Sequence, residues 1–211
     1  MAIVVVGGHS RSVGKTSVVA GLIAALPELR WTAVKITQFG HGLCANGSDC
    51  DCATDVHTHL IEEERDRSGG SDSSRFLVAG AERSLWARTK QGRLAEAMPD
   101  LRRALAAAPH VIIESNSVMQ FLRPDLYLTV LDYANKDFKA SARRYLDRAS
   151  AVILNEPQGR DPAWEDVSLR LIQGKPVFRV RPPEYVTPEM VEFVRGRLLA
   201  AAAPVDVRKN A

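Results

Sequence analysis

The sequence predicts an α/β protein with a three-layer α/β/α fold and a mostly parallel central sheet. Apolar runs of strand length recur along the chain, and segments with helical character separate most of them. The runs are continuously apolar rather than alternating, which is typical of strands covered on both faces, and strands that alternate with helices usually pair in parallel. The expected strands are residues 2–6, 31–36, 111–113, 126–131, 151–154 and 177–180, with 84–87 as an additional candidate.

Five segments are expected to form the helices. The last has the clearest start signal, because Thr187 can cap it and Pro188 would occupy its first position. The tripeptide Asn135-Lys136-Asp137 is interpreted as the start of the fourth helix, with Asn135 or Asp137 as its cap. The expected helices are residues 15–26, 72–79, 94–107, 138–148 and 188–200.

Length and charge favour one globular domain over residues 1–211. Lys and Arg number 28 against 25 Asp and Glu, a formal net charge of +3. This balance does not favour nucleic acid or a membrane surface as the main partner. No apolar run approaches the length of a membrane span and no signal peptide is apparent, so we expect a soluble, cytoplasmic protein.

Residues 7–16, Gly-Gly-His-Ser-Arg-Ser-Val-Gly-Lys-Thr, follow the first strand and have the character of a phosphate-binding loop. Backbone N–H groups of such a loop surround phosphate oxygens, Lys15 can reach the β- and γ-phosphates, and the Thr16 hydroxyl can bind Mg²⁺. The loop is one residue longer than usual, and we expect His9 to offer its backbone N–H rather than its ring. The alternative is a glycine-rich turn that binds nothing. The expected nucleotide-binding residues are Gly8, Ser10, Ser12, Val13, Gly14, Lys15, Thr16 and Ser17.

Two further stretches extend this pattern. Lys35 ends the second strand, and residues 70–76 read Gly-Ser-Asp-Ser-Ser-Arg-Phe, with Ala-Gly-Ala at 79–81. Together with the long phosphate loop, they resemble the dethiobiotin synthetase and molybdopterin-guanine dinucleotide biosynthesis protein B branch of the P-loop NTPases, in the SIMIBI class. The loop is similar to that of dethiobiotin synthetase, and the segment around Asp72 is similar to an Asp-Ser-x-Arg segment of the molybdopterin-linked family. The resemblance implies a P-loop NTPase fold, a nucleotide that is ATP or GTP, and a role for Lys35 facing phosphate or substrate.

Two strand ends carry residues to which the resemblance assigns a function. The stretch Val-Ile-Ile-Glu that ends at Glu114 resembles the Val-Glu-Gly of both families, whose acid lies beside Mg²⁺. The resemblance therefore implies that Thr16 and Glu114 hold this metal, although Ser115 and Asn116 replace the glycine-rich continuation. Asn155 is similar to an asparagine that hydrogen-bonds the nucleotide base in dethiobiotin synthetase-like proteins. The alternatives are a strand-end surface carboxylate for Glu114 and an ordinary turn for Asn155.

The segment at about 38–70 departs from the strand–helix rhythm, and we interpret it as a functional insertion in the domain. It carries all 3 cysteines and three of the 5 histidines, and the alternative interpretation of the segment is a mobile lid. Thiolates and imidazoles together suit Zn²⁺, a nickel or copper ion in transit, or an iron–sulfur cluster. The alternative is three free thiols or a reversible disulfide that serves as a redox switch. The candidate ligands are His41, Cys44, Cys50, Cys52, His57 and His59.

Three functions remain open from the sequence. The first is a Mg²⁺-dependent NTPase coupled to the Cys/His site, in cofactor biosynthesis or the maturation of a metalloenzyme partner. The second is an ATP-dependent small-molecule kinase or ligase that resembles dethiobiotin synthetase, and the third is an adapter that binds a nucleotide or pterin nucleotide with little turnover. Analogy with the fold class suggests a homodimer. The expected catalytic residues are Lys15, Lys35, Asp72 and Glu114.

Overall fold

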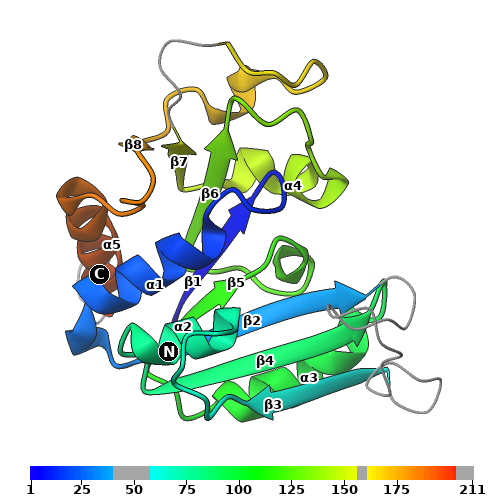
Figure 1. Cartoon of the computed structure of the whole chain (residues 1–211), viewed down its shortest axis with the longest axis vertical. Coiled ribbons are helices and arrows are strands. Elements are labelled where there is room, and N and C mark those ends of the chain that lie inside the picture. Colours follow the sequence, from blue (N-terminus) through cyan, green and yellow to red (C-terminus); the bar gives the residue numbers. More distant parts are fainter. Residues whose placement is uncertain (40–57, 156–160, 203–211) are drawn as a thin grey trace, which may run out of the picture.

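The computed structural model describes residues 1–39, 58–155 and 161–202. Within these ranges, eight strands form one sheet in the order β3-β4-β2-β5-β1-β6-β7-β8 (Figure 1). The strands are β1 (Ala2–Gly8), β2 (Trp31–Phe39), β3 (His59–Glu63), β4 (Arg83–Lys90), β5 (His110–Glu114), β6 (Leu126–Asp132), β7 (Ala151–Asn155) and β8 (Val177–Val180). The α-helices are α1 (Lys15–Ala25), α2 (Asp72–Val78), α3 (Leu94–Leu105), α4 (Ala140–Tyr145) and α5 (Pro188–Ala202).

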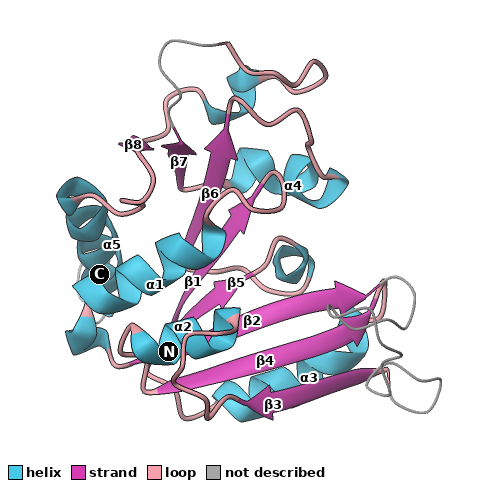
Figure 2. Cartoon of the chain, viewed as in Figure 1, coloured by secondary structure: helices cyan, strands magenta, loops and turns pink. Residues whose placement is uncertain are grey.

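The sheet confirms the predicted three-layer α/β/α architecture. Every neighbouring pair of strands is parallel except β3 and β4. Helices cover both faces of the sheet, as Figure 2 shows. Apolar side chains of α1, α2 and α5 form one core on the first face, and those of α3 and α4 pack into a second core on the other. The inner strands are buried along almost their whole length, which accounts for their continuously apolar sequences.

The edge strand β3 was not predicted. Its sequence, His-Leu-Ile-Glu-Glu, holds only two apolar residues and lies in the polar segment read as an insertion. Ile61 packs against the core under α3, whereas Leu60 remains 38% exposed. Glu62 and Glu63 form ion pairs with arginines of β4. Charged side chains of this kind are common on edge strands, where they discourage pairing with other chains.

The start of α4 corrects one expectation. This helix begins at Ala140, and neither Asn135 nor Asp137 caps it. The Asn135 side chain instead accepts the backbone N–H of Asp137 in a turn, and the Lys139 N–H donates to the carbonyl of His9 at 2.8 Å. Lys139, directly before the helix, is therefore extended and bonded to the phosphate loop. At α5 the prediction is confirmed, since Thr187 Oγ1 accepts the N–H of Met190 at 3.3 Å.

The topology determines where a ligand can bind. The chain leaves β1 through α1 to reach β2 on one side, and leaves β5 to reach β6 on the other side of β1. The loops that follow β1 and its two neighbours therefore diverge at the carboxyl edge of the sheet, where open α/β sheets hold their ligands. None of the helices in the described part of the chain combines the length and apolar character needed to cross a membrane.

Candidate functional site

The loop between β1 and α1 has the backbone geometry of an anion-binding turn. It ends at Gly14, whose φ of 93° lies in the left-handed region, and Lys15 is the first residue of α1. A Cβ atom at Gly14 would lie 2.0 Å from the ring of Tyr185, which comes from the segment before α5. Glycine is therefore required at this position for both its conformation and the space it leaves.

Asn116, in the loop that follows β5, fixes the end of β1. Its Oδ1 accepts the N–H of Gly8 at 2.9 Å, and its Nδ2 donates to the Gly8 carbonyl at 2.8 Å. A Cβ atom at Gly7 would lie 2.2 Å from the same Oδ1. Asn116, which departs from the glycine-rich family pattern, thus anchors the phosphate loop. Its side chain also occupies the Gly8 N–H, which was expected to bind the nucleotide.

His9 and Ser10 attach the loop to the segment after β6. The prediction that the His9 N–H binds a phosphate is wrong, because this group donates to the Val130 carbonyl. The buried His9 ring bonds through Nδ1 to the Asp137 carbonyl at 2.7 Å, and its Nε2 accepts the Asp132 N–H at 3.0 Å. Ser10 Oγ donates to the Asp137 carboxylate at 2.7 Å. These bonds of His9 and Ser10 thus link the phosphate loop after β1 to the segment after β6.

The side chain of Lys15 bonds back to the phosphate loop. Its Nζ donates to the carbonyl of Ser10 at 2.6 Å. Burial lowers the pKa of Lys15 to about 8, and the attraction of Glu114 only partly opposes this effect. Within the described ranges this partly buried ammonium bonds only to a neutral carbonyl, and it is therefore suited to bind an anion.

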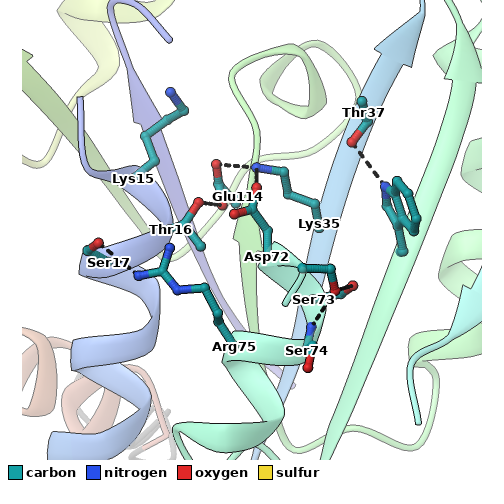
Figure 3. Close-up of polar contacts among 12 residues, drawn as sticks. Lys15, Thr16, Ser17, Lys35, Thr37, Asp72, Ser73, Ser74, Arg75 and Glu114 are labelled. Carbon is teal, nitrogen blue, oxygen red and sulfur yellow. Dashed lines mark hydrogen bonds and ion pairs between the residues drawn. The ribbon is translucent and has the colours of Figure 1, made fainter. Parts of the chain in front are cut away.

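Lys35 joins two carboxylates beside the loop (Figure 3). Its Nζ lies 2.6 Å from Asp72 Oδ2 and 2.6 Å from Glu114 Oε1. The side chain of Glu114 is 3% exposed, that of Lys35 18% and that of Asp72 40%. Burial by itself would lower the pKa of Lys35, but the two carboxylates outweigh it and raise this pKa. Burial likewise disfavours the Asp72 carboxylate, yet the bond from Lys35 leaves its pKa lowered.

Thr16 connects this cluster to the phosphate loop. Its Oγ1 donates to Glu114 Oε2 at 2.8 Å. The hydroxyl of Thr16 and the carboxylates of Asp72 and Glu114 therefore surround one small volume beside the N-terminus of α1 (Figure 3). The structure thus brings together the four residues expected to be catalytic and the two expected to hold Mg²⁺.

These groups line a cleft of about 800 Å³. Its walls also include Arg11, Arg75 and Lys139, which give the cleft five cationic side chains against two carboxylates. Burial, followed by repulsion from Arg11, lowers the pKa of Lys139. The cations of such a cluster repel one another, and an anionic ligand reduces this repulsion. The sequence did not predict a role for these three residues, although Arg75 belongs to the Asp-Ser-x-Arg segment that begins at Asp72.

Asn155 lies on the other side of the phosphate loop. This buried side chain donates through Nδ2 to the Val13 carbonyl at 2.9 Å, and its Oδ1 has no hydrogen-bond partner within the described ranges. A buried amide oxygen without a donor is costly, but within the described residues Asn155 is not among those that line the cleft. Tyr185 lines the cleft on the Gly14 side of the loop.

The structure separates one residue of the predicted Cys/His set from the cleft. His59 begins β3, and its Nε2 lies 3.0 Å from Asp100 Oδ2 on α3. The other five predicted ligands lie outside the described residues. In the part of the chain that the structure describes, no group of three or more metal-ligating side chains is found.

The three-layer topology and the loop that joins β1 to α1 define a P-loop NTPase fold. No family model matches the sequence, and no curated protein matches it. The structure is similar to LpxK from Aquifex aeolicus in complex with ATP, with 17% identity over 85% of this chain and 53% of that chain and a TM-score of 0.49.

Two further solved structures are similar over more of their length. HypB from Helicobacter pylori, in complex with nickel, has 14% identity over 94% of this chain and 86% of that chain, with a TM-score of 0.47. The MobB protein homolog from Bacillus stearothermophilus has 17% identity, coverages of 95% and 99%, and a TM-score of 0.46. At this level of similarity the matches assign no activity, which has to be inferred from the side chains of the cleft.

Proposed function

We propose that this protein binds a nucleoside triphosphate with Mg²⁺ in the cleft and hydrolyses it. The observation that carries the proposal is the bond between Thr16 of the phosphate loop and Glu114 of β5, 2.8 Å long, beside an ammonium suited to bind phosphate. A phosphate loop, a hydroxyl and a strand-end carboxylate are the parts that phosphoryl transfer requires.

The oxygen atoms in the cleft fit the proposed metal. Thr16 and Glu114 would hold Mg²⁺, and the nearby carboxylate of Asp72 would hold it or its water ligands, since Mg²⁺ prefers oxygen ligands of this kind. The cluster already accommodates one cation, because the Lys35 ammonium lies between the two carboxylates. Bound there, Mg²⁺ would neutralise charge that develops on the phosphates.

The residues of the chain divide the remaining tasks. Lys15 binds the β- and γ-phosphates, and Lys35 stabilises charge on the phosphoryl group or on a substrate. Asp72 orients water or binds the substrate. Asn155, whose Oδ1 has no partner within the described residues, would bind an N–H group of the base, an interaction that both ATP and GTP can provide.

Phosphate release from ATP and from GTP, with and without Mg²⁺, tests the proposal. Glu114→Gln keeps the shape of the side chain and removes its charge, so we expect Mg²⁺-dependent hydrolysis to fall roughly 100-fold or more, as for other electrostatic catalytic groups. Glu189→Gln on the exposed start of α5 is the matched control. Equal activity of the two variants would contradict the assignment of Glu114.

A specific observation favours a second candidate function, an ATP-dependent kinase or ligase. The cleft continues past Lys35 along the end of β2, where Thr37, Gln38 and Phe39 line it. We infer that a small acceptor would bind in this part of the cleft, beside the phosphate loop. ADP release that requires one added small acid would favour this function, and release without any acceptor would favour the NTPase.

The Cys/His set adds a proposal about biological context. Bound Zn²⁺, nickel or an iron–sulfur cluster would make the protein a metal- or cofactor-linked NTPase, acting in the cytoplasm as a homodimer with a cofactor-biosynthesis or metalloenzyme partner. Elemental analysis of protein purified without oxygen tests the metal. Near-stoichiometric metal that is lost in Cys50→Ser/Cys52→Ser supports it, whereas three titratable thiols without metal contradict it.

A further inference from the structure

Arg75 extends from α2 across the cleft toward the phosphate loop. It lies three residues after Asp72, so both side chains are on the same face of this short helix. Its Nη2 donates to Ser17 Oγ at 3.1 Å, one residue beyond Thr16 (Figure 3). A guanidinium from a separate helix thus lies directly beside the Thr16–Glu114–Lys35 cluster.

Within the part of the chain that the structure describes, no carboxylate forms an ion pair with Arg75, although its charge helps to lower the pKa of Asp72. The nearby Asp72 forms its ion pair with Lys35, and within the described residues Arg75 bonds only to the neutral hydroxyl of Ser17. Lys35, by contrast, is neutralised by two carboxylates. Arg75 is exposed and lines the cleft, so it can move to a ligand without giving up an ion pair.

The bond to Ser17 is not needed to hold α2 in place. Ser71 caps this helix through the N–H of Ser74, and Phe76 and Leu77 are buried beneath it. Arg67 also donates to the Leu77 carbonyl at 3.1 Å. An exposed bond between a guanidinium and a hydroxyl adds little to these contacts. A purely structural role therefore leaves the position of Arg75 unexplained.

We propose that Arg75 leaves Ser17 and binds the terminal phosphate of the nucleoside triphosphate, as an arginine supplied by the same chain. A planar guanidinium can donate two parallel hydrogen bonds to phosphate oxygens, and its charge offsets the charge that builds up when the terminal phosphoryl group is transferred. This inference rests on the proposed function, because it requires a triphosphate in the cleft. It adds a residue that distinguishes triphosphate from diphosphate.

Calorimetry of the full chain with a non-hydrolysable triphosphate analogue and with the diphosphate, both with Mg²⁺, tests this role. Arg75→Ala should weaken the triphosphate roughly 10- to 100-fold, as expected when a charge-assisted hydrogen bond is lost, and change the diphosphate affinity only slightly. Arg75→Lys should recover part of the loss, because it keeps the charge without the planar geometry. Arg67→Ala is the matched control, since this arginine bonds to α2 but does not line the cleft.

The outcomes separate this inference from the proposed function. Equal losses for triphosphate and diphosphate, or no loss for either, would overturn the role of Arg75 while leaving nucleotide binding intact. A wild-type protein that binds neither nucleotide would overturn both. If Arg75→Ala does not fold, Arg75→Gln and Arg75→Lys provide the same comparison after thermal melts show them to be folded.

Discussion

Lys35 and Glu114 are register partners on adjacent parallel strands, and their side chains meet at 2.6 Å. This pairing places the two opposite charges at the same level of the carboxyl edge of the sheet. Asp72 enters from the start of α2 and shares the same ammonium. Residues that are far apart in the sequence therefore form one charge cluster beside the phosphate loop.

Lys35→Met should destabilise the nucleotide-free protein. The variant leaves the carboxylates of Asp72 and Glu114 facing each other without their common cation, which should reduce the free energy of unfolding by about 2 kcal/mol. Urea denaturation at pH 7 measures this change. Added Mg²⁺ should restore more stability in the variant than in wild type, and Lys136→Met, at an exposed position, serves as the control. A variant as stable as wild type would show that the cluster is not an energetic unit.

Binding of a triphosphate should take up a proton at alkaline pH. Burial lowers the pKa of Lys15 to about 8, so the free protein carries a charged Lys15 at pH 7 and a mostly neutral one at pH 9. Because the phosphates require the ammonium, binding at pH 9 should draw close to one proton from solution and binding at pH 7 much less.

Calorimetry in buffers with different ionisation enthalpies measures this proton uptake. Lys139→Met is the control, because Lys139 is the other cleft lysine whose pKa is lowered. Uptake that persists in this variant identifies Lys15 as the titrating group. Binding without proton uptake at pH 9 would contradict the role of Lys15.

His9 should make the protein less stable in acid. Burial lowers the pKa of His9, although the bond to the Asp137 carbonyl opposes this shift. The unfolded chain then binds the proton first as the pH falls below 6.5, so stability is full above that value and declines below it, by at most about 1.4 kcal/mol per pH unit. His9→Gln should show a shallower decline between pH 6.5 and 5 in urea denaturation. If the stability of wild type and of His9→Gln declined equally between pH 6.5 and 5, the His9 ring would not be held neutral by its two hydrogen bonds.

Asn116→Ala should loosen the phosphate loop. The substitution removes both bonds to the Gly8 backbone and leaves buried groups without partners, at a cost of about 2 kcal/mol. Asn135→Ala, which removes one bond in an exposed turn, should cost much less. Thermal melts compare the two variants, and a similar decrease in Tm for both would contradict the anchoring role of Asn116.

The layers of the fold were predictable because buried parallel strands are apolar along their whole length. The edge strand β3 was missed since two apolar residues among charges give no periodic signal. The cap of α4 was predicted wrongly because Asn135 forms a local turn and the preceding segment bonds to His9, a contact that depends on the folded sheet.

The candidate site was predictable to a smaller extent. Lys15 and Thr16 follow from local spacing, and Lys35 and Glu114 from their strand ends and the family resemblance. Arg75 and Lys139 could not be assigned a role, because single cations in polar helices and turns are usually solvated. Their placement in the cleft depends on how α2 and the segment before α4 pack on the phosphate loop.

Calorimetry of wild type and Lys15→Ala with ATP and with GTP, in the presence of Mg²⁺, measures whether the phosphate loop binds a nucleoside triphosphate. The predicted result is binding of at least one triphosphate by wild type, lost in Lys15→Ala while the variant retains a cooperative thermal melt. Unchanged affinity of the variant for both triphosphates, or a folded wild-type protein that binds neither, would show that the loop is not a nucleotide-binding site.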